Sequence, residues 1–152
     1  MATLLDELSQ LISAFDKNEI EYAVCGGLAL AIHGFVRETL DIDVLIQPES
    51  LEKAYKVGAE NCFDIRRLDI SFKERAVEIR RVSKIDENGE VLSLDLLLVT
   101  PQVKDVWETR ETIDFLGNKL SVVSLKSLIK MKTLAGRPQD LADIARLENE
   151  EG

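Results

Sequence analysis

The chain has 152 residues, of which 45% are hydrophobic and 31% charged, and its formal net charge is −9. This size and composition fit one globular domain. The acidic balance argues against a broad basic surface for extended DNA. It remains compatible with a small nucleotide held by metal, because a bound cation reverses the local charge.

The chain has no sequence features of a membrane or secreted protein. No segment approaches the roughly 20 apolar residues of a membrane helix. The first residues lack the basic stretch that precedes an apolar run in a signal peptide. Cys25 and Cys62 lack metal-ligand spacing and are expected to be reduced thiols rather than a disulfide. A cytoplasmic protein is therefore expected.

Hydrophobic periodicity and turn residues predict the elements of the first half of the chain. Apolar residues at helical spacing predict an amphipathic helix over 3–17, which would pack against a sheet. A short strand over 22–25 leads into Gly26-Gly27. The next predicted elements are a helix over 28–33 ended by Gly34, a strand over 40–46, a helix over 48–60 and a strand over 64–68.

Turn signals organise the second half. Asn88-Gly89 predicts a hairpin of 77–85 with 91–99, and a second hairpin is expected between 111–115 and 120–123. A helix from Ser124 to 134, a break at Gly136, a last helix from Pro138 and a frayed end over 148–152 complete the chain. These elements predict a single α/β (α+β) domain over 1–152, with a mixed sheet flanked by helices.

Two acidic residues stand out on the strand predicted over 40–46. Asp41 and Asp43 are separated by one residue, so they project from the same face, about 6.5–7 Å apart. Ile42 and Val44 would then face the core. Two carboxylates at this spacing repel each other unless a cation or a proton intervenes.

A third acidic residue interrupts the strand predicted over 91–99. One face of that strand is uniformly apolar, whereas Asp95 lies with Ser93 on the other. If this strand pairs beside 40–46, three carboxylates converge, and that donor set suits Mg²⁺ or Mn²⁺ better than zinc. The alternatives are an ion pair between Asp95 and an arginine, and simple solvation of the other two carboxylates.

Gly26-Gly27 lies between a predicted strand and a predicted helix. At such a turn, backbone N–H groups can approach a phosphate without a side chain in the way. The chain has neither Gly-x-Gly-x-x-Gly nor Gly-Lys-Ser/Thr, so the sequence supports neither a dinucleotide fold nor a P-loop.

Residues 25–27 (Cys-Gly-Gly) and 41–43 (Asp-Ile-Asp) resemble the signature of the nucleotidyltransferase superfamily. That signature is a Gly-Gly or Gly-Ser turn and a short helix, followed by Asp-x-Asp or Asp-x-Glu on the next strand. A later stretch, Lys-x₄-Arg-x₂-Gln-Asp-x₂-Asp, is similar to a motif of the AbiEii-type toxin group, where lysine is usual at the place of Gln139. Its charged residues are Lys132, Arg137, Asp140 and Asp143.

The resemblance implies a metal-dependent transferase that moves a nucleoside monophosphate from a nucleoside triphosphate to an acceptor hydroxyl, with release of pyrophosphate. Asp41 and Asp43 would carry two Mg²⁺ or Mn²⁺ ions, and Asp95 would share one metal and help to deprotonate the acceptor. The expected phosphate contacts come from glycines and basic side chains: Gly26, Gly27, Arg37, Lys132 and Arg137. An ion pair with a nearby acid is the alternative for Arg37.

Further residues near these motifs have structural interpretations beside functional ones. His33 ends a helix, where histidine stabilises the terminus, and a place near the nucleotide is its alternative. Thr39 flanks the carboxylate strand. Asp140 and Asp143 begin the last helix and suit its dipole, with a structural ion pair expected between Arg137 and Asp140. Two arginine pairs are expected on solvated faces: Arg66-Arg67 and Arg80-Arg81.

Two other function classes stay open. A nucleotide-binding or partner-binding module without catalysis would explain Gly27 where many relatives have serine, and the lack of an obvious region for choosing an acceptor. The acceptor could be RNA, a protein or a small molecule, with a protein partner or a homodimer supplying part of its site. An aspartyl phosphatase of the haloacid dehalogenase type also uses Asp-x-Asp, but there an apolar strand precedes the motif, whereas here residues 38–40 read Glu-Thr-Leu.

Overall fold

The computed structural model describes residues 3–34, 41–72, 76–115 and 117–151. Its strands are β1 (Ala23–Cys25), β2 (Asp41–Ile46), β3 (Ile65–Arg66), β4 (Ile70–Phe72), β5 (Val77–Ile85), β6 (Val91–Leu98), β7 (Glu111–Phe115) and β8 (Asn118–Val122). Its helices are α1 (Leu4–Lys17), α2 (Gly26–Ile32), α3 (Leu51–Glu60), α4 (Lys104–Glu108), α5 (Leu125–Ala135) and α6 (Pro138–Glu151).

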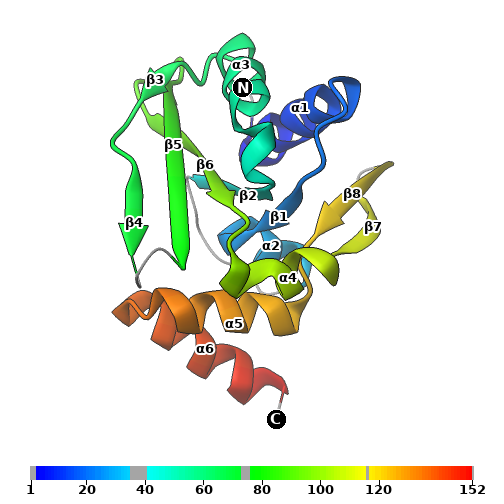
Figure 1. Cartoon of the computed structure of the whole chain (residues 1–152), viewed down its shortest axis with the longest axis vertical. Coiled ribbons are helices and arrows are strands. Elements are labelled where there is room, and N and C mark those ends of the chain that lie inside the picture. The colour runs from blue at the N-terminus through cyan, green and yellow to red at the C-terminus, as the bar shows by residue number, and fades with distance from the viewer. Residues whose placement is uncertain (1–2, 35–40, 73–75, 116, 152) are drawn as a thin grey trace.

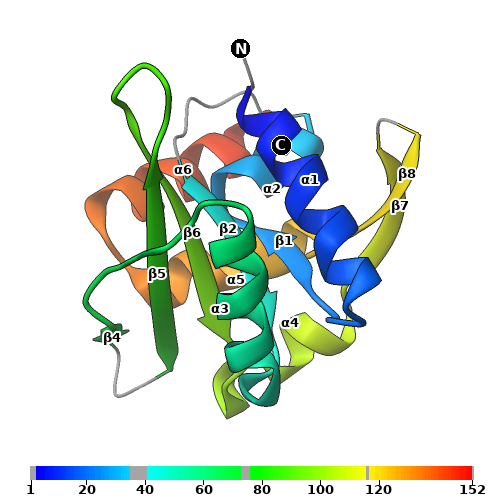
Figure 2. The same cartoon turned by 90° about the horizontal axis from the view of Figure 1, so that it is seen from above.

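The strands form one mixed sheet in the order β3-β5-β6-β2-β1-β8-β7, with β4 also paired to β5. The central pair, β2 and β6, is parallel, and β1 runs antiparallel to β2. Helices α1 and α3 lie on one side of the sheet, and α5 and α6 lie on the other (Figures 1 and 2). The central strands are therefore covered by helices on both faces, whereas β3 and β7 at the edges are largely exposed.

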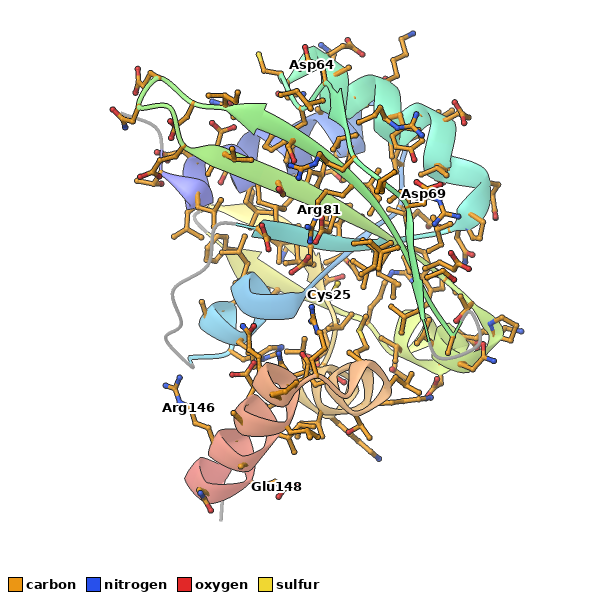
Figure 3. The ribbon with its side chains drawn as sticks, turned by 90° about the vertical axis from the view of Figure 1, so that its left-hand side faces the viewer. Cys25, Asp64, Asp69, Arg81, Arg146 and Glu148 are labelled. Carbon is orange, nitrogen blue, oxygen red and sulfur yellow. The ribbon has the colours of Figure 1, made fainter. Side chains whose placement is uncertain are left out.

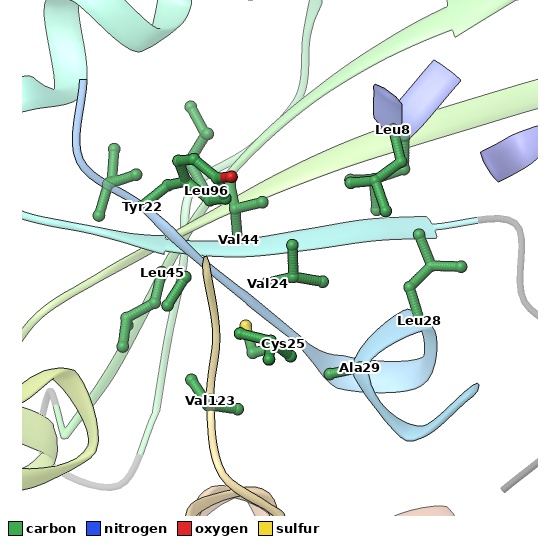
Figure 4. Close-up of a cluster of buried hydrophobic side chains, with 14 of the residues drawn as sticks. Leu8, Tyr22, Val24, Cys25, Leu28, Ala29, Val44, Leu45, Leu96 and Val123 are labelled. Atoms are coloured by element: carbon green, nitrogen blue, oxygen red, sulfur yellow. The ribbon is translucent and has the colours of Figure 1, made fainter. Parts of the chain in front are cut away.

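Burial on both faces explains why the central strands are so apolar, since polar alternation suits only a half-exposed strand. Val44 and Leu45 point to opposite sides of β2, and both belong to the buried cluster shown in Figure 4. Asp41, Asp43 and Asp95 are therefore exceptions on strands that otherwise bury apolar side chains.

Local signals explain several helix ends. The Thr3 hydroxyl accepts a hydrogen bond from the Asp6 N–H, and the Asp6 carboxylate accepts one from the Thr3 N–H, which forms a capping box for α1. The Ser124 hydroxyl caps α5 by accepting from the Ser127 N–H, and Gly136 ends that helix in the left-handed conformation. Among the described helices, none has the length and apolar character needed to cross a bilayer.

The structure confirms the predicted fold class and both hairpins, and it corrects other elements. The helix predicted over 48–60 begins as a 3₁₀ turn (Pro48–Ser50) before α3. The strand predicted over 64–68 is reduced to β3, and β4 was not predicted. Helix α4 was missed because five residues are too few to show helical periodicity. The last helix extends to Glu151, and the frayed end over 148–152 stays a prediction.

Candidate functional site

A row of four side chains crosses the centre of the sheet. The strand register aligns Cys25 with Asp43, Asp43 with Asp95, and Asp95 with Arg81, so β1, β2, β6 and β5 each contribute one residue. Cys25 and Arg81, which end the row, are labelled in Figure 3. The convergence predicted for Asp43 and Asp95 is therefore present, on adjacent parallel strands.

Asp41 lies one step along β2 from this row, on the same face. Its register partner is Ser93, whose hydroxyl is 3.0 Å from that of Ser83 on the next strand. Alternation along a strand places Asp41 about 6.5–7 Å from Asp43. We refer to the three aspartates and the arginine together as the carboxylate row, a term that leaves out Cys25. Its members are Asp41, Asp43, Asp95 and Arg81.

Arg81 holds Asp95 by two parallel hydrogen bonds. Nε donates to Oδ1 at 2.6 Å and Nη2 donates to Oδ2 at 2.9 Å, and Asp95 is only 4% exposed. A bidentate pair of this kind fixes the orientation of the carboxylate. The prediction that Arg80-Arg81 lies on a solvated face is therefore wrong for both residues, since the side chain of Arg80 is only 20% exposed and pairs with Glu78. The ion pair with an arginine that was considered for Asp95 is the arrangement observed.

Asp43 lies between two other carboxylates and is only partly exposed. Burial raises its pKa well above the usual value, and the charge of Asp95, a side-chain hydrogen bond with Asp95 and the charge of Asp41 add to this effect. Arg81 opposes the shift. Three carboxylates share one guanidinium here, so the carboxylate row favours a further cation or a proton.

The buried thiol of Cys25 has a pKa raised well above its usual value. Burial is the main cause, and the charges of Asp43 and Asp95 act in the same direction. Cys25 and Cys62 are both free. The Cys25 thiol is therefore poorly suited to be a nucleophile.

Gly26 brings the glycine turn against the carboxylate row. Its φ is +66°, and a methyl group added there would lie 2.0 Å from the Oδ2 atom of Asp43. A side chain is thus excluded both by conformation and by space. The turn can bring its backbone N–H groups toward a ligand that also contacts Asp43.

A second group of charges, which we call the C-terminal cluster, joins α5 to α6. Lys132 Nζ lies 2.8 Å from Asp143 Oδ2 and 3.7 Å from Asp140 Oδ1. Arg137 donates to both oxygens of Asp140, at 2.7 Å from Nε and 3.2 Å from Nη2, and the predicted ion pair is present. Burial opposes the ionisation of Asp140, but the hydrogen bond and charge of Arg137 lower its pKa below the usual value.

One cavity of about 380 Å³ connects these groups. Most of the predicted site residues line it: Gly26, Gly27, Asp41, Asp43, Asp95, Lys132, Arg137 and Asp140. His33 instead ends α2 and pairs its Nε2 with the carbonyl of Val123 at 2.9 Å. Arg37 and Thr39 lie outside the described residues.

The donor chemistry of the carboxylate row fits a divalent cation. Carboxylate oxygens are the ligands that Mg²⁺ and Mn²⁺ prefer. The pKa of Asp43 is raised mainly by burial and further by the charges of Asp95 and Asp41, so a bound cation would favour its ionised form. As the side chains stand, the described part of the chain contains no group of three or more His, Cys, Asp or Glu residues placed to hold a metal. Both oxygens of Asp95 are engaged by Arg81. The fit is therefore best at Asp41 and Asp43.

Sequence reasoning missed Arg81 as a residue of the site. Its signal was available, because Arg81 is two residues from the buried Ile79 on the face of β5 that meets Asp95. Counted back from a two-residue turn at Asn88-Gly89, however, the register would have placed Leu96 opposite Arg81. The observed loop has three residues, 87–89, and this shift of one residue aligns Arg81 with Asp95.

Comparisons with known proteins agree with this architecture. Residues 1–148 match a family described as nucleotidyltransferase of unknown function (DUF6036). No curated protein matches the chain significantly in sequence.

Solved structures with the same fold have low sequence identity. A candidate nucleotidyltransferase from Thermotoga maritima matches with a TM-score of 0.69 and 16% identity, over 96% of this chain and 92% of that one. The lincosamide antibiotic adenylyltransferase LnuA, bound to lincomycin, matches with a TM-score of 0.61 and 14% identity, over 93% of this chain and 94% of that one. ANT(2″)-Ia in complex with adenylyl-2″-tobramycin matches with a TM-score of 0.58 and 13% identity, over 92% of this chain and 84% of that one.

Proposed function

This chain belongs to the DUF6036 family of nucleotidyltransferases, and from that premise we propose that it transfers a nucleoside monophosphate from a nucleoside triphosphate to an acceptor hydroxyl in a metal-dependent reaction. The carboxylate row beside the glycine turn is the observation that carries the proposal. Three neighbouring carboxylates repel one another unless a cation or a proton intervenes, and the adjacent glycine turn allows backbone N–H groups to approach a phosphate.

The residues would divide the work as follows. Asp41 and Asp43 hold Mg²⁺ or Mn²⁺, which when bound stabilises the attacking and leaving oxygens of the phosphoryl transfer. The backbone of Gly26 and Gly27 approaches the phosphates. Lys132, 7% exposed and fixed by Asp143, supplies positive charge at a set position on the cavity wall.

Asp95 would take the proton of the acceptor hydroxyl as the acceptor oxygen attacks the α-phosphorus and the bond to pyrophosphate breaks. Arg81 acts as a positioning residue, since its two hydrogen bonds fix the plane of the Asp95 carboxylate. A second metal shared by Asp95 would require that Arg81 release one of its oxygens.

We also propose that residues 1–152 form a single nucleotidyltransferase-like domain, which is supported by the buried hydrophobic cluster that unites the helices and the sheet.

A triphosphate donor and two free cysteines support a cytoplasmic location. ATP is the first donor to test, because one similar structure is described as an antibiotic adenylyltransferase and another as a complex with adenylyl-2″-tobramycin. The relation to AbiEii-type toxins stays a prediction from the C-terminal motif.

A nucleotide-binding module without transfer is the second candidate. The bidentate pairing of Arg81 with Asp95 favours it, because both oxygens of the proposed proton acceptor already accept a hydrogen bond from a cation, which lowers its basicity. Both candidates require nucleotide binding, and they differ in whether a product forms.

Calorimetric titration of ATP, GTP, CTP and UTP with Mg²⁺ or Mn²⁺ tests the site. The wild-type protein should bind one or more of them only with metal, and Asp41→Asn/Asp43→Asn should lose at least about 100-fold in affinity, or about 2.7 kcal/mol. Asp105→Asn/Asp114→Asn removes two surface carboxylates and is the matched control. Equal affinity in all three proteins would refute the site.

Transfer of label from an α-labelled triphosphate then separates the two candidates. A labelled acceptor, formed by the wild type and lost in Asp95→Asn, is expected for the enzyme. Nucleotide binding with no product from a wide acceptor panel, including RNA, proteins and small alcohols, would favour the binding module.

A further inference from the structure

The floor of the cavity contains an apolar row directly beside the carboxylate row. The register aligns Leu45 with Leu97, Leu97 with Ile79, and Ile79 with Ile70, across strands β2, β6, β5 and β4. Each of the first three is two residues from a member of the carboxylate row, on the same face and about 6.5–7 Å along the strand. The charged side chains of the carboxylate row are therefore followed, two residues away on each strand, by apolar side chains on the same face.

One face of α5 forms the opposite wall of this apolar region. Leu128, Met131 and Leu134 recur at helical spacing and all line the cavity. Met131 and Leu134 are only partly buried, as are Leu97 and Ile70 on the floor. Floor and wall thus leave apolar surface accessible to a ligand within the same cavity as the carboxylates.

The apolar row extends to the acceptor side of the proposed reaction. The glycine turn follows β1, which pairs with one edge of β2, whereas β6, β5 and β4 continue from the other edge. Strand spacing of about 4.8 Å places Ile79 and Ile70 one and two strands beyond Asp95, away from the turn. A molecule resting there could direct a hydroxyl at Asp95 while phosphates remain near Gly26.

The described residues of the apolar floor and of the facing side of α5 contribute no charged side chain to the slot. Glu78 also lines the cavity, and its carboxylate already accepts hydrogen bonds from Ser71 Oγ at 2.9 Å and from Arg80 Nη1 at 3.0 Å. An amine-rich acceptor would therefore have to pair with the carboxylate row, where we propose that the metal binds, and would gain little from the slot itself.

We propose that this apolar slot, formed by Leu45, Ile70, Ile79, Leu97 and the facing side of α5, binds the acceptor, and that the acceptor is an uncharged hydroxyl compound with an alkyl or aryl body. This inference rests on the proposed function, since it assigns the acceptor class for the same site. The slot favours small apolar alcohols over sugars, polyols and polyamines.

Primary alcohols from 1-propanol to 1-hexanol are suitable probes, with glycerol as the polar comparison. Their dissociation constants are measured by ligand-observed NMR, on the protein alone and with Mg²⁺ and α,β-methylene ATP. Affinity should rise about fourfold for each added CH₂, since burial of one such group contributes about 0.8 kcal/mol. Glycerol should show no binding in the same range.

Two variants of the slot report on its location. Leu97→Gln on the floor and Met131→Gln on the wall should each weaken 1-hexanol at least fivefold, while calorimetry shows donor affinity within twofold of the wild type. Leu68→Gln makes the same substitution at a residue that is 88% exposed and lies outside the cavity lining, and should change neither. Retained α-helical circular dichroism controls for folding.

The outcomes separate this inference from the proposed function. Affinity that does not depend on chain length would overturn the slot, even if the nucleotide binds. Donor affinity that falls as far as alcohol affinity in Leu97→Gln would show that the slot holds the nucleobase instead. Alcohol binding in the slot without any nucleotide binding would support the slot and refute the transferase assignment.

Discussion

The carboxylate row and the C-terminal cluster are both built from aspartates and cations, yet their charges are balanced differently. Among the described residues, the row combines three carboxylates with the guanidinium of Arg81. The cluster combines two carboxylates with two cations, and every one of its four side chains has an ion-pair partner. An unbalanced group favours a ligand of opposite charge, whereas a balanced group mainly fixes the positions of its members.

Removing the buried cation of the C-terminal cluster should have the largest effect on stability. Lys132→Met leaves Asp140 and Asp143 with Arg137, whose side chain is 63% exposed. Loss of one partner from a buried ion pair should lower the free energy of unfolding by about 3 kcal/mol. Urea denaturation measures the change. Lys130 lies on α5, as Lys132 does, and its ion pair with Asp105 is exposed. Lys130→Met should therefore change the free energy of unfolding little. Similar losses in both variants would contradict the interpretation of the C-terminal cluster as balanced.

Removing the cation of the carboxylate row should have a smaller effect that metal can reverse. Arg81→Met should lower the free energy of unfolding by about 2 kcal/mol, because hydrogen bonds to a charged group are lost. Mn²⁺ should then restore stability, since a cation that binds only the folded state stabilises it. Thermal unfolding with and without Mn²⁺ measures the recovery. The comparison fails if Mn²⁺ rescues Lys132→Met equally well.

A change without charge tests whether geometry also matters in the carboxylate row. Gly26→Ala should cost about 1–2 kcal/mol from its positive φ and the displacement of Asp43, and it should weaken nucleotide binding at least tenfold. Gly89→Ala has a φ of +79° but no atom within 4 Å of the added methyl group, so it isolates the conformational part. Equal nucleotide affinity in both variants would argue against close contact between the turn and the nucleotide.

The pH dependence of stability should differ in sign between the carboxylate row and the C-terminal cluster. These changes in the free energy of unfolding should be the smallest of those predicted. The pKa of Asp43 is raised in the folded state. Its contribution to the free energy of unfolding is therefore fully present below the unfolded pKa of about 3.9, and it is lost as pH rises through the raised folded pKa. In EDTA, wild type should therefore gain stability over Asp43→Asn as pH falls from 7 to 5.

Asp140 should behave in the opposite way. Its pKa is lowered, so its contribution is present above about pH 3.9 and is lost as pH falls further. The stability difference between wild type and Asp140→Asn should stay constant from pH 7 to 5 and shrink below about pH 4. Parallel curves for the Asp43 and Asp140 variants would remove the distinction between the regions.

The sequence was most informative where strand alternation alone decides orientation. Asp41, Asp43 and Asp95 could be assigned to one face because side chains in a strand alternate, and the apolar Leu92, Leu94, Leu96 and Leu98 marked the other face of their strand. Asn88-Gly89 fixed the hairpin of β5 and β6. These local rules were sufficient for much of the fold and for the acidic half of the site.

Other features depend on which elements become neighbours. Arg81 joins the site only because β5 pairs with β6 and β6 with β2, a strand order that periodicity does not determine. The apolar row likewise exists through the pairing of four strands, and each of its residues is an ordinary core residue in isolation. Lys132 was identified from its motif, but its burial between Asp140 and Asp143 depends on the packing of α5 on α6.

The parallel pairing of β2 with β6 also has a consequence for folding kinetics. It joins Asp43 to Asp95 across a long intervening stretch that includes α3 and β5. Such non-local pairings close late, because the loop entropy must be overcome before the contacts form. A metal or nucleotide that needs both strands would bind after most of the barrier is crossed. Bound ligand should therefore slow unfolding much more than it accelerates refolding.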